Sequence, residues 1–150
     1  MAGKFLSVKI HLIWSTKGRR RLLQPQWMHR LFAFIATVAR AKGAILIEAN
    51  SQPDHIHLIV SMPSTISIAE LVNAIKANST RWIRQTLAQH NWFGWQDGYA
   101  AFSVSTSLEQ TVIQYIRDQD QHHRRRSFQE ELLELLDSHG VEYDPRYVFD

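Results

Sequence analysis

The sequence contains no cysteine, which excludes disulfide bonds and thiolate metal sites from this chain. It also contains no apolar run near the ~20 residues that a membrane-spanning helix needs. Lys4, Lys9 and His11 interrupt the N-terminal segment, so the apolar centre of a signal peptide is missing. No glycine-rich phosphate loop is present, and we expect no organic cofactor. These absences predict a cytoplasmic protein with no membrane partner.

The composition is sufficient for one folded domain. The 150 residues are 45% hydrophobic and 11% aromatic, which permits a substantial core. Repeats, linkers and low-complexity segments are not found in the sequence, so a single domain over 1–150 is the simplest organisation.

The net charge of +3 is modest, and its distribution is more informative than its size. Basic residues gather at 17–21, 76–84 and 124–126, whereas acidic residues gather near the C-terminal end. A single basic cluster is usually a solvated surface, but three clusters favour a nucleic-acid partner. The candidate nucleic-acid contacts are Lys17, Arg19, Arg20, Lys76, Arg81 and Arg84.

Alternating apolar residues predict strands, and apolar residues at helical spacing predict helices. The expected strands cover 5–15, 44–49, 55–61 and 99–105. The expected helices cover 27–42, 67–87, 107–124 and 128–138. Capping boxes are expected at Ser67 with Glu70, and at Thr106 or Ser107. A loop is expected at 91–98, and a loosely ordered tail is expected to extend to Asp150.

This order of elements, β-α-β-β-α-β followed by two helices, predicts an α+β fold. It suits a ferredoxin-like split β-α-β-β-α-β sandwich, with an antiparallel sheet, helices on one face and additional C-terminal helices.

Two histidines in the third expected strand are candidate metal ligands. His55 and His57 are two residues apart, so both imidazoles project from the same face while Ile56 points to the opposite side. Two imidazoles can share one divalent cation, although a third ligand must come from elsewhere. The pattern alone fits two surface histidines equally well.

The helix expected at 107–124 carries Tyr115 and Gln119, which lie one turn apart on one face. A glutamine carbonyl can ligate a hard cation such as Mg²⁺ or Mn²⁺. A tyrosine hydroxyl can act as a covalent nucleophile against a metal-polarised centre. A lone helical tyrosine is more often a core aromatic, so spacing alone does not establish this role.

Several stretches together resemble the IS200-like single-tyrosine transposases, whose motif is histidine-hydrophobic-histidine. The matching stretches are 11–17, 53–60, 66–72, 79–83, 98–105 and 112–116, in the family's order and over nearly the whole chain. The resemblance implies that His55 and His57 bind the catalytic metal, that Tyr115 is the nucleophile, and that C-terminal helices carry it. It further implies that Gln119 is a metal ligand, although the adjacent His122 and His123 could compete for that place.

The resemblance also implies a homodimer, in which the tyrosine helix of either the same subunit or the other one completes each active site. It implies that this dimer cuts and rejoins single-stranded DNA at element ends marked by subterminal hairpins. The expected reaction is a transesterification that leaves a 5′-phosphotyrosine link and a free 3′-hydroxyl. A single-stranded substrate would use aromatic surfaces for base stacking, for which Trp14, Trp82, Trp92 and Trp95 are candidates. Two alternatives remain open from the sequence. One is a domesticated hairpin-binding protein that does not cut, and the other is a hydrolase whose histidines activate water.

Overall fold

The computed structural model describes residues 3–87, 92–123 and 125–149. Asn91 of the expected loop, Arg124 of the third basic cluster and the last tail residue, Asp150, lie outside the described residues. Among the described residues, no helix is both long and apolar enough to span a bilayer.

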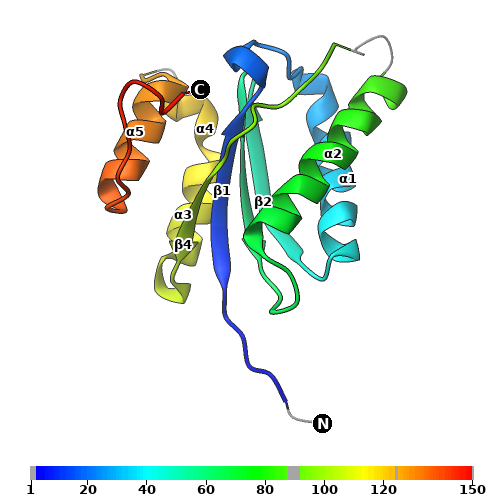
Figure 1. The fold of residues 1–150 in the computed structure, drawn as a ribbon, viewed down its shortest axis with the longest axis vertical. Helices are drawn as coiled ribbons and strands as arrows, with labels where there is room; N and C mark the ends of the chain where they lie inside the picture. The colour runs from blue at the N-terminus through cyan, green and yellow to red at the C-terminus, as the bar shows by residue number, and fades with distance from the viewer. Residues whose placement is uncertain (1–2, 88–91, 124, 150) are drawn as a thin grey trace.

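A four-stranded antiparallel sheet forms the middle layer of the molecule (Figure 1). Its strands are β1 (Lys9–Ser15), β2 (Ile45–Gln52), β3 (His55–Ser61) and β4 (Ala100–Val104). The strand order is β2-β3-β1-β4, so β1 and β3 occupy the centre and β2 and β4 the edges. This order confirms the predicted ferredoxin-like α+β fold, since the two halves of the β-α-β-β-α-β sequence interleave in one sheet.

Two helices, α1 (Met28–Ala41) and α2 (Ile68–Thr86), cover one face of the sheet (Figure 1). The even-numbered side chains of β1 and β3 point toward these helices and form the main core with them. Ser67 accepts the backbone N–H of Glu70 at 3.1 Å, which confirms the predicted start of α2. The main core contains Leu12, Trp14, Ile56, Leu58, Val60, Leu31, Ile35, Leu71 and Ile75.

The opposite face is covered by α3 (Glu109–Arg117), α4 (Gln119–His122) and α5 (Phe128–Ser138) (Figure 1). The prediction of helices on one face therefore holds for the β-α-β-β-α-β unit, and the additional C-terminal helices cover the other face. The physical reason is that this second face is also partly apolar. Ile59 packs with Ile113 and Ile116, whereas Ile13 and Phe102 pack with residues of α5.

The helix expected over 107–124 is interrupted. A 3₁₀ turn (Thr106–Leu108) precedes α3, and Asp118, with φ −92° and ψ 19°, separates α3 from α4. The capping box expected at Thr106 or Ser107 is absent from this described segment. The break leaves two carbonyls at the end of α3 without helical partners, and Asn50 Nδ2 donates to both, at 2.9 Å to Ile116 and 3.2 Å to Arg117.

Three further features differ from the sequence prediction. Strand β1 begins at Lys9 instead of residue 5. Strand β2 continues to Gln52, so the turn before β3 contains only Pro53 and Asp54. The tail is more ordered than expected, because Tyr143, Val148 and Phe149 pack against the cluster beneath α5. Short 3₁₀ turns also occur at Lys17–Arg19 and Pro25–Trp27.

Candidate functional site

The sheet face beneath α3, α4 and α5 carries three buried histidines. Ile13 of β1 is paired with His57 of β3 in the register, so their side chains lie on the same face of the sheet. His11 lies two residues from Ile13, and His55 lies two residues from His57, so all three imidazoles project from that face. Their neighbours on the same strands, Leu12 and Ile56, point into the main core instead. The strand alternation thus separates an imidazole-bearing face from a fully apolar one.

Glu131 of α5 lies at the centre of the imidazoles. Its Oε1 is 2.9 Å from His57 Nε2 and 3.0 Å from His123 Nε2, and it approaches His55 Nε2 to 3.4 Å. One ligand atom from each of these four residues lies within 4.8 Å of the others. Glu131, His55 and His57 are fully buried, and His123 is nearly so. Three imidazoles and one carboxylate in this arrangement form a group that could hold a metal ion.

Tyr115 of α3 reaches the same centre. Its hydroxyl donates to Oε2 of Glu131 and accepts a hydrogen bond from Nη2 of Arg126 at 2.8 Å. Its ring stacks on His122, with the ring centroids 4.4 Å apart. Burial, followed by the negative charge of Glu131, raises the pKa of Tyr115 above its ordinary value. The phenol therefore carries its proton at neutral pH.

Two hydrogen bonds behind the site orient the imidazoles. Asp54 Oδ1 lies 2.6 Å from His55 Nδ1, and His11 Nε2 lies 2.8 Å from His57 Nδ1. Burial lowers the pKa of His11 to about 3, so His11 is neutral and can accept a hydrogen bond. Burial also lowers the pKa of His57. The bonds to Asp54 and Glu131 outweigh burial at His55 and raise its pKa.

The same contacts act on Glu131. Burial by itself favours the protonated carboxyl, but the hydrogen bonds from His123, His55 and His57 outweigh it and hold the pKa of Glu131 well below its usual range. Glu131 is therefore an ionised carboxylate that faces a cluster of imidazoles, which is an electrostatic environment suited to a cation.

Gln119 begins α4, immediately after the helix break, and is fully buried. Its amide Nε2 donates to the Tyr115 carbonyl at 3.3 Å, while its Oε1 is buried without a hydrogen-bond partner. His55 Nε2 is likewise buried and has no hydrogen bond of good geometry. Unpaired buried lone pairs are costly unless something binds them. Both atoms fit the donor set of a cation site.

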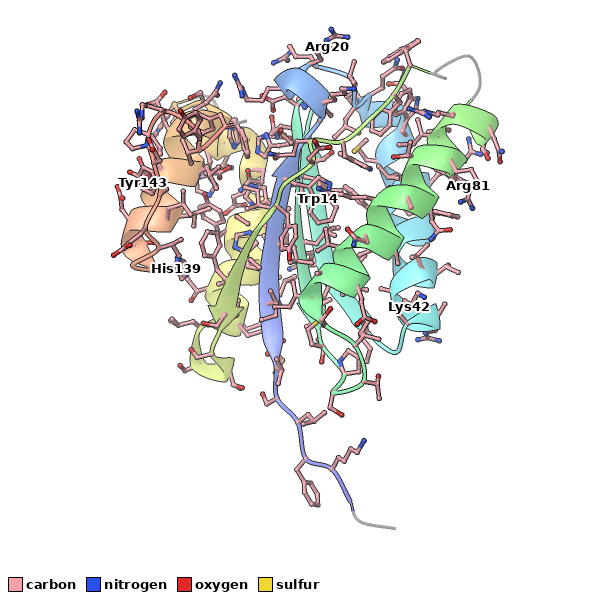
Figure 2. All side chains as sticks on the ribbon, in the orientation of Figure 1. Trp14, Arg20, Lys42, Arg81, His139 and Tyr143 are labelled. Atoms are coloured by element: carbon pink, nitrogen blue, oxygen red, sulfur yellow. The ribbon has the colours of Figure 1, made fainter. Side chains whose placement is uncertain are left out.

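The expected nucleic-acid contacts divide into two groups. Lys17, Arg20, Arg81 and Arg84 are exposed, and Figure 2 shows Arg20 and Arg81 projecting outward from separate parts of the molecule. Lys76 is half-buried, and its ammonium donates to the carbonyls of Gln96, Asp97 and Gly98.

Two of these basic side chains also hold neighbouring backbone. Arg84 Nε donates to the carbonyl of Phe93 at 2.9 Å, so Arg84 and Lys76 both stabilise the loop before β4. Arg19 donates to the Phe149 carbonyl and is half-buried.

The candidate stacking tryptophans also differ from one another. Trp14 is fully buried between the sheet and α2 (Figure 2), and Trp95 is buried with its indole N–H on Ser79 Oγ. These two are core residues and present no surface for bases. Trp82 is half-buried and stacks on Phe34, whereas Trp92 is about half exposed.

Three residues of the site escaped the sequence reasoning. Glu131 was counted only among the acidic residues near the C-terminal end, although it lies three residues after Phe128 and adjacent to Leu132 on the apolar face of α5. His11 lies on the same strand face as Ile13, and strand alternation could have identified it. For Arg126, whose contact with Tyr115 depends on the helix break, no signal in the sequence was available.

Comparisons with known proteins identify the family of this chain. The family described as "Transposase IS200 like" matches residues 4–119. The ISDra2 transposase TnpA of Deinococcus radiodurans is 28% identical over 122 residues, covering 78% of this chain and 87% of that protein. A transposase crystal structure from D. radiodurans R1 superposes with a TM-score of 0.60 at 27% identity, covering 79% of this chain and 97% of that one.

A REP-associated tyrosine transposase bound to a REP hairpin also superposes, with a TM-score of 0.60 at 17% identity, covering 82% of this chain and 74% of that one. At that identity the likeness concerns the fold alone. Because the family match covers well over half of the sequence, this chain belongs to the IS200-like transposases, a family of DNA-processing enzymes.

Proposed function

We propose that this transposase cleaves and rejoins single-stranded DNA at element ends through a covalent bond between Tyr115 and a 5′-phosphate. The observation that carries the proposal is the position of one carboxylate. Glu131 accepts the Tyr115 hydroxyl on one oxygen, and its other oxygen lies 2.9 Å from His57 Nε2 and 3.4 Å from His55 Nε2. The nucleophile and the imidazole pair therefore share one centre within a single chain.

The reaction exchanges one phosphoester for another. The Tyr115 oxygen attacks a DNA phosphorus, an O–P bond to tyrosine forms, and the bond from phosphorus to the 3′-oxygen breaks. The phenol loses its proton and the departing 3′-oxygen gains one, so the products are a 5′-phosphotyrosine and a free 3′-hydroxyl. A different 3′-hydroxyl can reverse the attack and join new strands without an external energy source.

The residues around Tyr115 support this role. Glu131 accepts the hydroxyl hydrogen, which turns the oxygen lone pairs away from that carboxylate, and Arg126 Nη2 places positive charge 2.8 Å from the oxygen. Charge that develops on the phenol oxygen during attack is stabilised by a fixed donor of this kind. The ring stack with His122 restrains the side chain's rotation.

A divalent cation, Mg²⁺ or Mn²⁺, would be held by His55 and His57, with Gln119 as the proposed third ligand. When bound, it would polarise a phosphate oxygen and stabilise the leaving 3′-oxygen. The fit rests on the buried, unpaired acceptors at His55 Nε2 and Gln119 Oε1.

A basic surface leads to the site. An open hollow of about 500 Å³ next to Tyr115 is lined by Gln121, His122, Arg125 and Arg126. On the other side, Lys17, Arg19 and Arg20 follow the end of β1, where Ser15 pairs with His55. A single strand that passes between these surfaces would place its phosphates beside basic side chains on both sides of Tyr115. Lys76, Arg81 and Arg84 lie on α2, which covers the opposite face of the sheet, so they are separate candidate DNA contacts outside this path.

The substrate in this proposal is a hairpin-bearing element end, as in the hairpin complex of the structurally similar REP-associated transposase. The working form in this proposal is a homodimer. Each chain brings its own Tyr115 to its own histidines, so cleavage at one site needs no residue from the partner.

The test is covalent trapping. Wild-type protein incubated with single-stranded element ends and Mn²⁺ should yield a protein–DNA adduct on a denaturing gel, and chelation should abolish it. Tyr115→Phe should bind the same DNA and give no adduct. Tyr147→Phe, at an exposed tyrosine far along the tail, should behave as the wild type.

Two outcomes would favour the alternatives. Cleavage that persists in Tyr115→Phe would indicate that water, and not Tyr115, attacks the phosphate. Hairpin binding with no adduct at any end sequence would favour a binding protein that does not cut.

A further inference from the structure

We propose that His123 and Glu131 complete the cation centre with His55 and His57, in the place that the sequence assigned to Gln119, and that the centre binds first-row transition metals that favour imidazole nitrogen, such as Co²⁺ and Zn²⁺, more tightly than Mg²⁺. The inference deepens the proposed function, because it concerns the metal of the same site. His123 and Glu131 lie after position 119, where the family match ends, so the matched region does not provide them.

The first argument is distance. In a tetrahedral centre with bonds of about 2.0 to 2.2 Å, neighbouring ligand atoms lie about 3.3 to 3.6 Å apart. Glu131 Oε1 lies at 2.9, 3.0 and 3.4 Å from the Nε2 atoms of His57, His123 and His55. The four ligand atoms lie within 4.8 Å of one another, so Glu131 would move slightly away from the imidazoles, and the imidazoles closer to one another, to form a coordination sphere.

The second argument is the orientation of the ring nitrogens. Asp54 is a hydrogen-bond acceptor, so the proton of neutral His55 lies on Nδ1 and its Nε2 lone pair faces Glu131. That nitrogen is buried and lies 3.4 Å from Glu131 Oε1 without a hydrogen bond of good geometry. A lone pair directed at a carboxylate oxygen is unfavourable unless a cation lies between them, which is a proton in the metal-free protein and a metal ion when one is bound. A carboxylate behind a metal-binding histidine is a recurrent supporting contact.

The same reasoning extends to His57. His11 Nε2 lies 2.8 Å from His57 Nδ1, so His11 accepts that N–H when the Nε2 atom of His57 turns to a cation. His11 is thus a positioning residue for His57, as Asp54 is for His55. No comparable support is needed at Glu131, whose second oxygen is held by the Tyr115 hydroxyl.

The third argument is ligand chemistry. Mg²⁺ prefers six oxygen ligands and retains several waters, which a buried centre with three imidazoles does not provide. Imidazole nitrogen favours first-row transition metals. Because His123 and Glu131 come from the segment after the helix break, a bound metal would also join α5 to β3.

The experiment is a Co²⁺ titration of the full chain, followed by calorimetry and visible absorption, with Mg²⁺ measured in parallel. Wild type should bind Co²⁺ at least a hundredfold more tightly than Mg²⁺. Glu131→Gln and His123→Ala should each weaken Co²⁺ binding tenfold or more. Glu131→Asp, which retains a carboxylate, should bind more tightly than Glu131→Gln.

Matched controls lie close by. Glu130→Gln is one residue away on α5, is exposed, and keeps a side chain that can complete the capping box with Ser127. His29→Ala removes an exposed histidine on α1. Neither should alter Co²⁺ affinity, and circular dichroism would establish that every variant is folded.

Hydrogen exchange adds a readout that does not depend on activity. Co²⁺ should slow amide exchange over 128–138 in the wild type but not in Glu131→Gln. Unchanged Co²⁺ affinity in both ligand variants, or Mg²⁺ binding as tight as Co²⁺ binding, would overturn the inference.

The two proposals fail separately. If Gln119→Ala alone weakens metal binding while DNA adducts still form, the strand-transfer proposal stands and this one falls. If Co²⁺ binds as described but no adduct forms with Mg²⁺, Mn²⁺ or Co²⁺, the proposed metal ligands stand and the strand-transfer proposal falls.

Discussion

The guanidinium of Arg126 donates from Nη2 to the hydroxyl oxygen of Tyr115 at 2.8 Å, while that hydroxyl donates to Glu131. A fixed positive donor on the attacking oxygen stabilises negative charge as it develops there. Arg126→Gln should therefore slow adduct formation by roughly 10²-fold in single-turnover assays. Co²⁺ affinity should stay close to the wild-type value, because Arg126 is not a proposed ligand.

Arg40→Gln, at an exposed arginine on α1, serves as the charge-matched control. If Arg126→Gln slows adduct formation no more than this control does, Arg126 has no part in stabilising the phenol oxygen.

Two helices begin with a serine cap and provide a matched pair. Ser127 accepts the N–H of Glu130 at the start of α5, and Ser67 accepts the N–H of Glu70 at the start of α2. Replacing either serine by alanine should lower the free energy of unfolding by about 1 kcal/mol. Only Ser127→Ala should also weaken Co²⁺ binding, since α5 carries Glu131. Equal effects of both variants on Co²⁺ affinity would indicate a general loss of stability instead.

Lys76, which lies away from the metal centre, makes the stability of the folded protein depend on pH. Burial lowers its pKa from 10.5 to about 8, so between these two values the unfolded chain binds a proton that the folded chain has released. The Lys76 contribution to stability should consequently rise as the pH increases from 8 toward 10.5. Urea denaturation of wild type and Lys76→Met should show their difference moving in favour of the wild type over this window. A constant difference would show that Lys76 titrates normally.

The indole of Trp95 makes a buried hydrogen bond that fixes the loop before β4. Its N–H donates to Ser79 Oγ at 2.9 Å, and both side chains are buried. Ser79→Ala should be destabilising because it leaves the buried indole N–H of Trp95 unpaired. Trp95→Phe should be destabilising because it removes one of the two hydrogen bonds of Ser79 Oγ, which also donates to the Lys76 carbonyl at 3.3 Å. In a double-mutant cycle the coupling free energy should be about 1 kcal/mol. A coupling near zero would mean that the two residues act independently.

Much of the scaffold could be predicted from the sequence because its signals are local. The turn residues before His55 and Pro63 after Ser61 identified β3 with the correct bounds, and Ser67 identified the start of α2. The shared direction of the His55 and His57 side chains also followed from strand geometry alone. The family resemblance, carried by several motifs in order, was confirmed by the match over 4–119.

The C-terminal third was harder to predict because its structure depends on distant contacts. The break at Asp118 is stabilised by Asn50, which is far away in sequence and caps the end of α3. Glu131 has the local composition of a solvated helix, and only the packing of α5 on the sheet turns it toward His57. The roles of Tyr115 and Gln119 stay predictions, as do the six basic contacts.

The antiparallel pairing of β1 with β3 has a consequence for how this protein can fail. A slip of one residue between these strands would direct His55 and His57 into the apolar layer and place Ile56 among the polar groups. Such a chain would lose the apolar burial that stabilises its fold and, at the same time, the placement of its histidines. Defective folding and inactivity should therefore appear together whenever one residue is inserted into, or deleted from, the middle of β1 or β3.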